Sequence, residues 1–335
     1  MRSIRRFAAV CVAAVASLAG STTRVRAGEP SEPATVPMPT LGGMQFWADQ
    51  LFFHQWRIQQ NVYTGHYRLL DGDDYRHASG TYQQCLAALE RIKVRDKLPP
   101  MRGKAVVVLH GLGHSRAAMD DLAKYLKEKG GYEVFNVAYP STRVEIAEHA
   151  RSLKHILDHL DGIEEINFVA HSMGNIVVRH YLGDPQAGTP TDAAAKRKPD
   201  PRLARFVMLG PPNHQAYLAV LAGSNGLFRA VTGEPGQQLG REWDHLEEHL
   251  ATPQFEFAII AGGRGKDRGY NPVVPGDNDG VVSVASTRLA GASDFAVLPV
   301  MHTFMMNDPK VQEYTLRFLR EGCFLSPKQR QPVTK

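Results

Sequence analysis

From residue 104 to residue 322 the chain alternates two hydrophobic patterns. Short continuous apolar runs, such as AVVVL after Lys104, are typical of strands that are covered on both faces. Between these runs, apolar residues recur every three or four positions, which predicts amphipathic helices. The regular alternation favours a mostly parallel sheet with helices on both faces. The predicted strands are 104–111, 132–139, 165–172, 202–210, 254–262 and 294–300, and the predicted helices are 116–130, 143–160, 173–183 and 309–322.

The chain before residue 104 has a different pattern. Residues 28–41 are rich in proline, which is typical of an extended linker. The aromatic stretch 44–63 predicts an amphipathic helix, and residues 81–94 predict a second helix that ends before Pro99 and Pro100. We therefore expect a helical N-terminal extension over residues 42–101, with its aromatic side chains packed as a cap on the main domain.

Two segments interrupt the alternation inside the main domain, which we place at residues 102–323 with a tail at 324–335. Residues 183–201 are charged and rich in proline, and they are interpreted as an exposed excursion. Residues 211–250 are longer and more apolar, as expected of a lid or binding loop. Five apolar residues of this lid-like insertion would either line a pocket or pack the lid itself: Leu218, Val220, Leu221, Leu227 and Phe228.

The excess of positive charge belongs to the first residues of the chain. The net charge is +5, from 39 basic and 34 acidic residues. Five of the basic residues and none of the acidic ones lie within residues 1–27, so the remainder is balanced in charge. A basic surface for nucleic acid is therefore not expected.

Residues 1–27 themselves have the pattern of a signal peptide. Basic residues near the N-terminus precede an apolar stretch at 7–20, and Val25-Arg26-Ala27 is a small-x-small cleavage site. The alternative is an uncleaved membrane anchor, but the apolar stretch is short for spanning a bilayer. We expect export to the periplasm or beyond, with cleavage near Ala27. In that oxidising environment Cys85 and Cys323 either form a bridge or stay as two buried thiols, and the sequence leaves both open.

The junction between the predicted strand 165–172 and the helix 173–183 carries the candidate chemistry. It reads Val169-Ala-His-Ser-Met-Gly174, with Ser172 between the small residues Ala170 and Gly174. Small residues allow a sharp turn that exposes the serine hydroxyl, as in the G-x-S-x-G elbow, from which Ala170 is a departure. A serine becomes an effective nucleophile only with a histidine base, which in turn needs a carboxylate.

The sequence A-H-S-M-G at 170–174 resembles the nucleophile elbow of bacterial lipases and esterases of the α/β-hydrolase superfamily. The resemblance covers about residues 104–320 and implies the α/β-hydrolase fold, with the partners in the order serine, acid, histidine. Asp279 looks like the acid of the family's D-G-x-V loop, and Asp277 is the second candidate. A simple Asx-rich turn and an incomplete calcium loop are alternative interpretations of this loop. His302 follows the last predicted strand and is the expected base.

The dipeptide His110-Gly111 resembles the family's H-G motif, which implies that the backbone N–H groups of Leu112 and Met173 form an oxyanion hole. Together these residues imply a Ser-His-Asp hydrolase of small-molecule or lipid esters that needs no metal or organic cofactor. Acyl transfer and thioester or amide hydrolysis could use the same residues. The sequence is also compatible with a non-catalytic binding protein on a hydrolase fold, and with a lipid or protein surface that contacts helix 44–63 and the insertion. Acyl-chain length and oligomeric state are left open.

Overall fold

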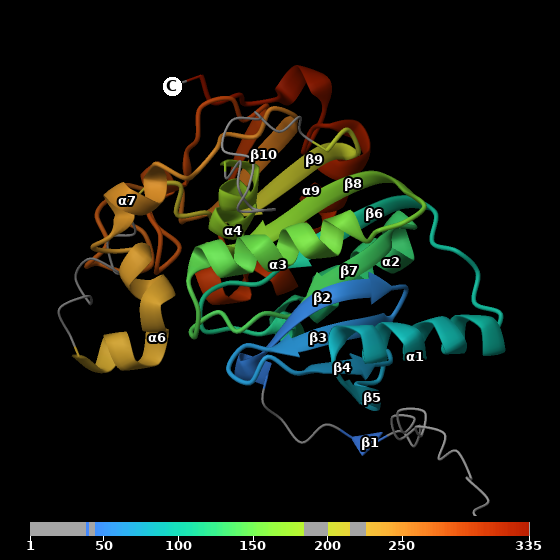
Figure 1. Cartoon of the computed structure of the whole chain (residues 1–335). Coiled ribbons are helices and arrows are strands. Elements are labelled where there is room, and N and C mark those ends of the chain that lie inside the picture. Colours follow the sequence, from blue (N-terminus) through green and yellow to red (C-terminus); the bar gives the residue numbers. More distant parts are fainter. Residues whose placement is uncertain (1–37, 40–43, 184–199, 215–225, 335) are drawn as a thin grey trace, which may run out of the picture. The chain divides into compact units, whose positions relative to one another are not determined.

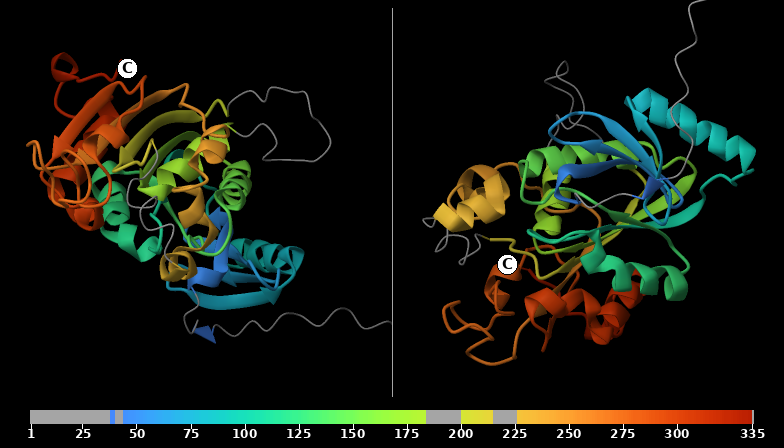
Figure 2. Two further views of the ribbon diagram at one scale, coloured as in Figure 1. Left: turned by 90° about the vertical axis from the view of Figure 1, so that its left-hand side faces the viewer. Right: turned by 90° about the horizontal axis from the view of Figure 1, so that it is seen from below.

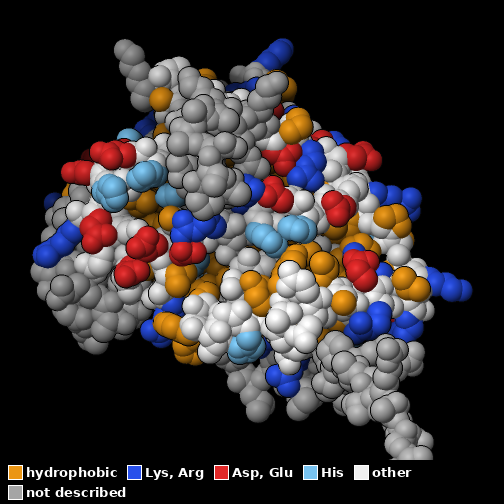
Figure 3. Space-filling view, viewed as in Figure 1, with side chains coloured by type: hydrophobic (Ala, Val, Ile, Leu, Met, Phe, Trp, Pro, Cys, Tyr) orange, Lys and Arg blue, Asp and Glu red, His pale blue; other side chains and the backbone are white. Residues whose placement is uncertain are grey.

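The computed structural model describes residues 38–39, 44–183, 200–214 and 226–334. The expected signal peptide, most of the expected linker and most of the excursion at 183–201 lie outside the described residues. No helix among the described ones is long and apolar enough to cross a membrane. On the face in Figure 3, acidic side chains gather at the left of the view, and acidic and basic side chains are interspersed over the rest.

The main sheet has six strands in the order β11-β10-β9-β8-β6-β7 (Figure 1). All of its pairings are parallel, so the prediction of a parallel α/β sheet is confirmed. Each predicted strand is present with shifts of a few residues at its ends. The bounds are β6 Gly103–Leu109, β7 Glu133–Val137, β8 Ile163–His171, β9 Leu203–Leu209, β10 Glu256–Gly262 and β11 Asp294–Leu298.

Helices cover both faces of this sheet (Figure 1). Successive side chains of a strand point to opposite faces, so a strand covered on both sides must be apolar throughout. In β6, Ala105, Val107 and Leu109 pack with one apolar cluster, and Val106 and Val108 pack with the other. Helices α3 Ile146–Asp158 and α4 Met173–Gly183 belong to the first face, and α2 Asp120–Gly130 and α9 Pro309–Glu321 to the second.

The N-terminal region forms an antiparallel sheet in the order β1-β5-β4-β3-β2, followed by helix α1. In Figure 2 the strands (blue) and α1 (cyan) lie together beside the main sheet. The bounds are β1 Met38–Pro39, η1 Met44–Phe46, β2 Trp47–Phe53, β3 Trp56–Asn61, β4 Tyr67–Leu70, β5 Tyr75–Gly80 and α1 Tyr82–Arg95.

The helix predicted at 44–63 is therefore wrong, since this stretch is a hairpin of β2 and β3. The chain reverses at His54, whose φ of 50° is the left-handed conformation of a tight turn. Aromatic residues favour a pleated, half-buried surface, and here they overrode the apparent helical spacing. The helix predicted at 81–94 is confirmed by α1. It begins at this point because Thr81 and Gln84 form a reciprocal capping box.

The N-terminal sheet and the main sheet share one apolar core. Leu51, Ile58 and Leu69 lie in the same buried cluster as Phe168 and Ile176. At the junction, the N–H of Asp49 donates to the carbonyl oxygen of Ala138 at 2.9 Å, and the Ala138 N–H donates to the Asp49 carboxylate at 2.6 Å. Leu51, Phe52 and Ile58 of the stretch 44–63 are thus buried, whereas Phe46 and Tyr63 near its ends are exposed. The helix that the lipid-surface alternative requires is not formed.

The insertion at 211–250 contains helices α6 Gly226–Gln238 and α7 Trp243–Glu247 in its described part. Trp243 and Leu246 are buried in the first apolar cluster, so α7 is anchored to the domain. Of the expected lid residues, Leu218, Val220 and Leu221 lie outside the described residues, as do the side chains of Leu227 and Phe228. Cys85 and Cys323 are both buried free thiols, so the bridge between them is not formed.

Candidate active site

Ser172 sits in a strained turn between β8 and α4. Its φ is 53°, in the left-handed region that non-glycine residues seldom adopt. The turn is fixed on both sides: the Ser172 N–H donates to the carbonyl oxygen of Leu209 at 2.9 Å, and the Asn175 side chain donates to the carbonyl oxygen of Ser172 at 2.9 Å. The surrounding hydrogen bonds therefore stabilise a backbone conformation that is unfavourable for a serine by itself.

The small residues around Ser172 have a steric reason. A Cβ atom on Gly174 would lie 2.8 Å from the carbonyl oxygen of His110 and 2.9 Å from that of Leu109. Ala170 is fully buried in β8 between its neighbouring strands. A larger side chain at either position would push the elbow away from β6.

His302 lies at the start of the 3-10 helix η3 His302–Asn307, just after β11. Its Nε2 atom is 2.9 Å from Ser172 Oγ, and its Nδ1 atom is 2.6 Å from Asp279 Oδ2. With the Nδ1–H donated to the carboxylate, Nε2 is left to accept the serine proton. The structure thus joins the three sequence-predicted residues in one series of hydrogen bonds.

Asp279 is held so that one carboxylate oxygen is reserved for His302. Its Oδ1 atom accepts the N–H groups of Val281 at 2.9 Å and Val282 at 2.7 Å. Its carbonyl oxygen accepts the N–H of His302 at 2.9 Å. The side chain is 1% exposed, so this orientation is protected from solvent.

Asp277 has a different environment. Its carboxylate accepts the N–H of Arg264 at 2.7 Å and that of Gly265 at 2.9 Å, so it orders the loop that follows β10. The structure places Asp279, and not Asp277, against the histidine. Within the described part of the chain, no group of three or more side chains is arranged as a metal site, so the calcium-loop interpretation gains no support.

The loop after β6 passes directly beside the serine. A Cβ atom on Gly111 would lie 2.9 Å from the Cβ atom of Ser172. The loop is held by hydrogen bonds from the Gly113 N–H to Ser141 Oγ at 3.1 Å and from the His114 N–H to the carbonyl oxygen of Gly111 at 3.3 Å. Met173 is the first residue of α4, so its N–H has no acceptor within the helix. The two expected oxyanion donors, Leu112 and Met173, are therefore on segments adjacent to Ser172.

Two further histidines belong to this environment, and neither ring has a role that the sequence pattern predicts. The buried His171 donates its Nε2–H to the carbonyl oxygen of His302 at 3.0 Å. The buried His110 donates its Nδ1–H to the carbonyl oxygen of Gly111 at 2.9 Å and stacks on Tyr139. Burial lowers the pKa of His171 well below its ordinary value and that of His110 to about 4. Both rings are thus neutral at neutral pH and leave the proton-accepting role to His302.

The sequence and fold of this chain are similar to those of known proteins. The sequence matches the alpha/beta hydrolase family over residues 106–325. Similar solved structures include a Bacillus licheniformis lipase (21% identity over 62% of this chain and 89% of that one, TM-score 0.45). A Legionella pneumophila phospholipase has 19% identity over 65% and 60% of the two chains, with a TM-score of 0.45. A Pyrococcus furiosus esterase has 14% identity over 88% and 98%, with a TM-score of 0.41. No curated protein sequence matches the chain. Since the family match covers most of the chain, the protein belongs to the alpha/beta hydrolase family.

Proposed function

We propose that this protein is an exported serine hydrolase of carboxylic esters, with a preference for lipid-like acyl groups. The observation that carries the proposal is the continuous hydrogen-bonded series from Asp279 through His302 to Ser172. A serine nucleophile needs such a histidine base and carboxylate, and here both lie in one hydrogen-bonded series with the serine of the strained elbow.

In the proposed reaction, Ser172 Oγ attacks the acyl carbonyl carbon while His302 Nε2 accepts its proton. Asp279 stabilises the imidazolium that forms, and the N–H groups of Leu112 and Met173 stabilise the negative oxygen of the tetrahedral intermediate. His302 then protonates the leaving alcohol. Water, deprotonated by the same histidine, attacks the acyl-enzyme and releases the acid.

The residues beside His302 support an apolar acyl group. Phe304 is 61% exposed and Met301 is 44% exposed, and both flank the proposed base in sequence. Val281, two residues after the proposed acid in the chain, is also exposed. Large apolar side chains left in contact with water near a reacting centre favour a substrate with an apolar part.

Export is part of the proposal and depends on the signal-peptide pattern of residues 1–27. N-terminal sequencing of the protein recovered outside the cytoplasm should begin at Gly28. A mature protein that still begins at Met1 would contradict it.

The catalytic proposal is tested with p-nitrophenyl esters from acetate to palmitate, using wild-type protein beside Ser172→Ala and His302→Ala. Either substitution should lower turnover by about 10⁴-fold or more while the circular dichroism spectrum stays unchanged. Turnover retained in Ser172→Ala would reject the serine mechanism. If the folded wild-type protein cleaves no ester of the series, the ester specificity is rejected.

A further inference from the structure

A cavity of about 340 Å³, lined by both charged and apolar side chains, lies between the N-terminal sheet and the loops that follow β6 and β7. It is separate from the proposed catalytic centre, because Ser172, Asp279 and His302 do not line it. In open α/β sheets, ligands bind outside the carboxyl ends of the strands, and this cavity lies at the carboxyl ends of β6 and β7. The cavity volume is within the range of small-molecule sites. Its floor is buried and its rim, at Asp74 and Tyr75, is exposed.

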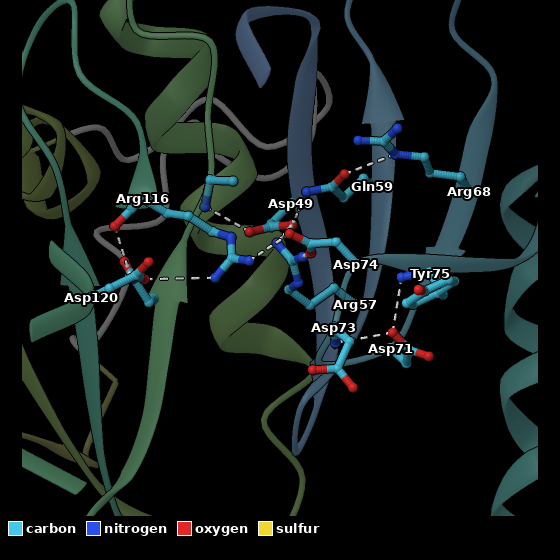
Figure 4. Close-up of polar contacts among 12 residues, drawn as sticks. Asp49, Arg57, Gln59, Arg68, Asp71, Asp73, Asp74, Tyr75, Arg116 and Asp120 are labelled. Atoms are coloured by element: carbon cyan, nitrogen blue, oxygen red, sulfur yellow. Dashed lines mark hydrogen bonds and ion pairs between the residues drawn. The ribbon is translucent and has the colours of Figure 1, made fainter. Parts of the chain in front are cut away.

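Two of the three arginines in its wall are paired with carboxylates (Figure 4). Arg57 forms an ion pair with Asp74 and lies 3.6 Å from the buried Asp49. Arg116, from the loop after β6, contacts Asp74 at 2.7 Å and Asp120 at 3.8 Å. These pairs tie the N-terminal sheet to the main domain and account for both positive charges.

Arg68 is different, because its charge is not balanced by a close carboxylate. Its Nε–H donates to the neutral side chain of Gln59 at 2.9 Å, and its guanidinium lies over the Trp47 ring at 3.9 Å from the centroid. Among the described residues, no acidic group lies within 4.0 Å of it. Burial and the nearby positive charge of Arg57 lower the pKa of Arg68 to about 10. A bound anion would offset the repulsion between this half-buried positive charge and the neighbouring one.

The remaining wall offers apolar surface and one buried acceptor. Trp47, Leu70 and Tyr139 line the cavity with rings and an aliphatic side chain. His110 also lines it, and its Nε2 atom is buried without a hydrogen-bond partner among the described residues. Because Nδ1 carries the proton, this Nε2 atom is an acceptor, and the anionic group of a ligand would not pair with it.

From these features we propose that the cavity is a second ligand site, which binds a small organic anion. The carboxylate or phosphate of the ligand would accept hydrogen bonds from the Arg68 guanidinium, and its apolar part would lie against Trp47 and Tyr139. The planar guanidinium of an arginine can form two parallel hydrogen bonds with either a carboxylate or a phosphate. Arg68 would thus recognise the anionic end of the ligand, and the aromatic rings would recognise its apolar end. This site does not depend on the ester-hydrolase proposal, because none of the proposed catalytic groups contributes to it.

Binding of three probes by isothermal titration calorimetry tests the proposal: benzoate, phenyl phosphate and inorganic phosphate. Wild-type protein should bind at least one of the two organic anions at one site, and more tightly than inorganic phosphate. Arg68→Gln should weaken that binding by about tenfold or more, since hydrogen bonds to charged groups are lost. Arg68→Lys keeps the charge without the fork and should bind with intermediate affinity. Arg91→Gln removes the same charge from the exposed face of α1 and should bind like the wild type.

Thermal unfolding of each variant checks that the fold is kept, and Arg68→Lys provides the comparison if Arg68→Gln does not fold. The proposal is overturned if no organic anion binds saturably. It is equally overturned if Arg68→Gln and Arg68→Lys bind as tightly as the wild type, which would place the anion elsewhere, such as beside Ser172. Inorganic phosphate that binds as well as phenyl phosphate would remove the role of the aromatic wall.

Discussion

The imidazole of His171 donates a hydrogen bond from Nε2 to the backbone carbonyl oxygen of His302 at 3.0 Å. The two rings lie 4.6 Å apart between centroids, and the Nδ1 atom of His171 would be 3.1 Å from a Cβ atom on Gly111. The residue next to the proposed nucleophile therefore contacts both the chain that carries the proposed base and the loop that carries an oxyanion donor. We therefore infer that His171 positions these segments, since its Nε2–H is donated to His302 and its Nδ1 atom has no hydrogen-bond partner among the described residues.

Replacing His171 with phenylalanine keeps a buried ring but removes the hydrogen bond to His302. One lost hydrogen bond is worth about 1 kcal/mol, so kcat should fall about fivefold while KM changes little. The readout is the kinetics of p-nitrophenyl ester hydrolysis, with His180→Phe on α4 as the control for burying a phenylalanine. Equal kinetics in His171→Phe and wild type would show that the hydrogen bond does not position His302.

The two aspartates of the acid loop should respond differently to the change to asparagine. Asp279→Asn removes the charge opposite His302 Nδ1 and should lower kcat by about 10³–10⁴-fold. Asp277→Asn loses one of the two carboxylate oxygens that accept the N–H groups of Arg264, Gly265 and Asn278. It should cost about 1–3 kcal/mol of unfolding free energy and leave turnover nearly unchanged. The kinetics and the urea unfolding of both variants are measured. A large loss of kcat in Asp277→Asn and not in Asp279→Asn would identify Asp277 as the acid.

The shared core predicts that the N-terminal sheet and the main domain unfold together. Leu69 is fully buried in that core, so Leu69→Ala should lower the free energy of unfolding by about 2–5 kcal/mol. Val94→Ala, at a position 79% exposed on α1, should change it little. Urea unfolding is followed by circular dichroism and by fluorescence of Trp47, Trp56 and Trp243. Two separate transitions would show that the sheet folds as an independent unit.

The buried His149 predicts a loss of stability in acid. Burial lowers its pKa to about 3 in the folded protein, from an ordinary value of 6.5. Below pH 6.5 the unfolded chain takes up a proton that the folded chain does not, so unfolding is favoured as the pH falls. At pH 5 this difference is worth about 2 kcal/mol compared with pH 8.

His149→Leu should therefore show a smaller change in unfolding free energy between pH 8 and pH 5 than the wild type. His245, whose side chain is 80% exposed, provides the control, and His245→Leu should keep the wild-type pH dependence. The measurement is urea unfolding at both pH values. An unchanged slope in His149→Leu would mean that this ring does not carry the acid sensitivity.

Some features of this protein follow from the sequence by itself. Continuous apolar runs at strand length and amphipathic repeats between them lead to a doubly covered parallel sheet, because a strand like 105–109 can only be buried on both faces. The order of Ser172, Asp279 and His302 along the chain indicates the candidate site, because the loops after parallel strands meet at one edge of the sheet. The match to the alpha/beta hydrolase family agrees with the fold that this pattern predicts.

Other features were decided only by tertiary structure. The aromatic stretch 44–63 suggests an amphipathic helix, and only packing against α3 and the neighbouring strand explains the burial of Leu51, Phe52 and Phe53 in a hairpin. The choice of Asp279 over Asp277 depends on which carboxylate faces a ring more than twenty residues away in the chain. The hydrogen bond from His171 to His302 and the isolated charge of Arg68 likewise depend on distances between segments remote in sequence. A local pattern indicates the period of an element, whereas its burial and the partners of its polar atoms are fixed only when the whole chain has folded.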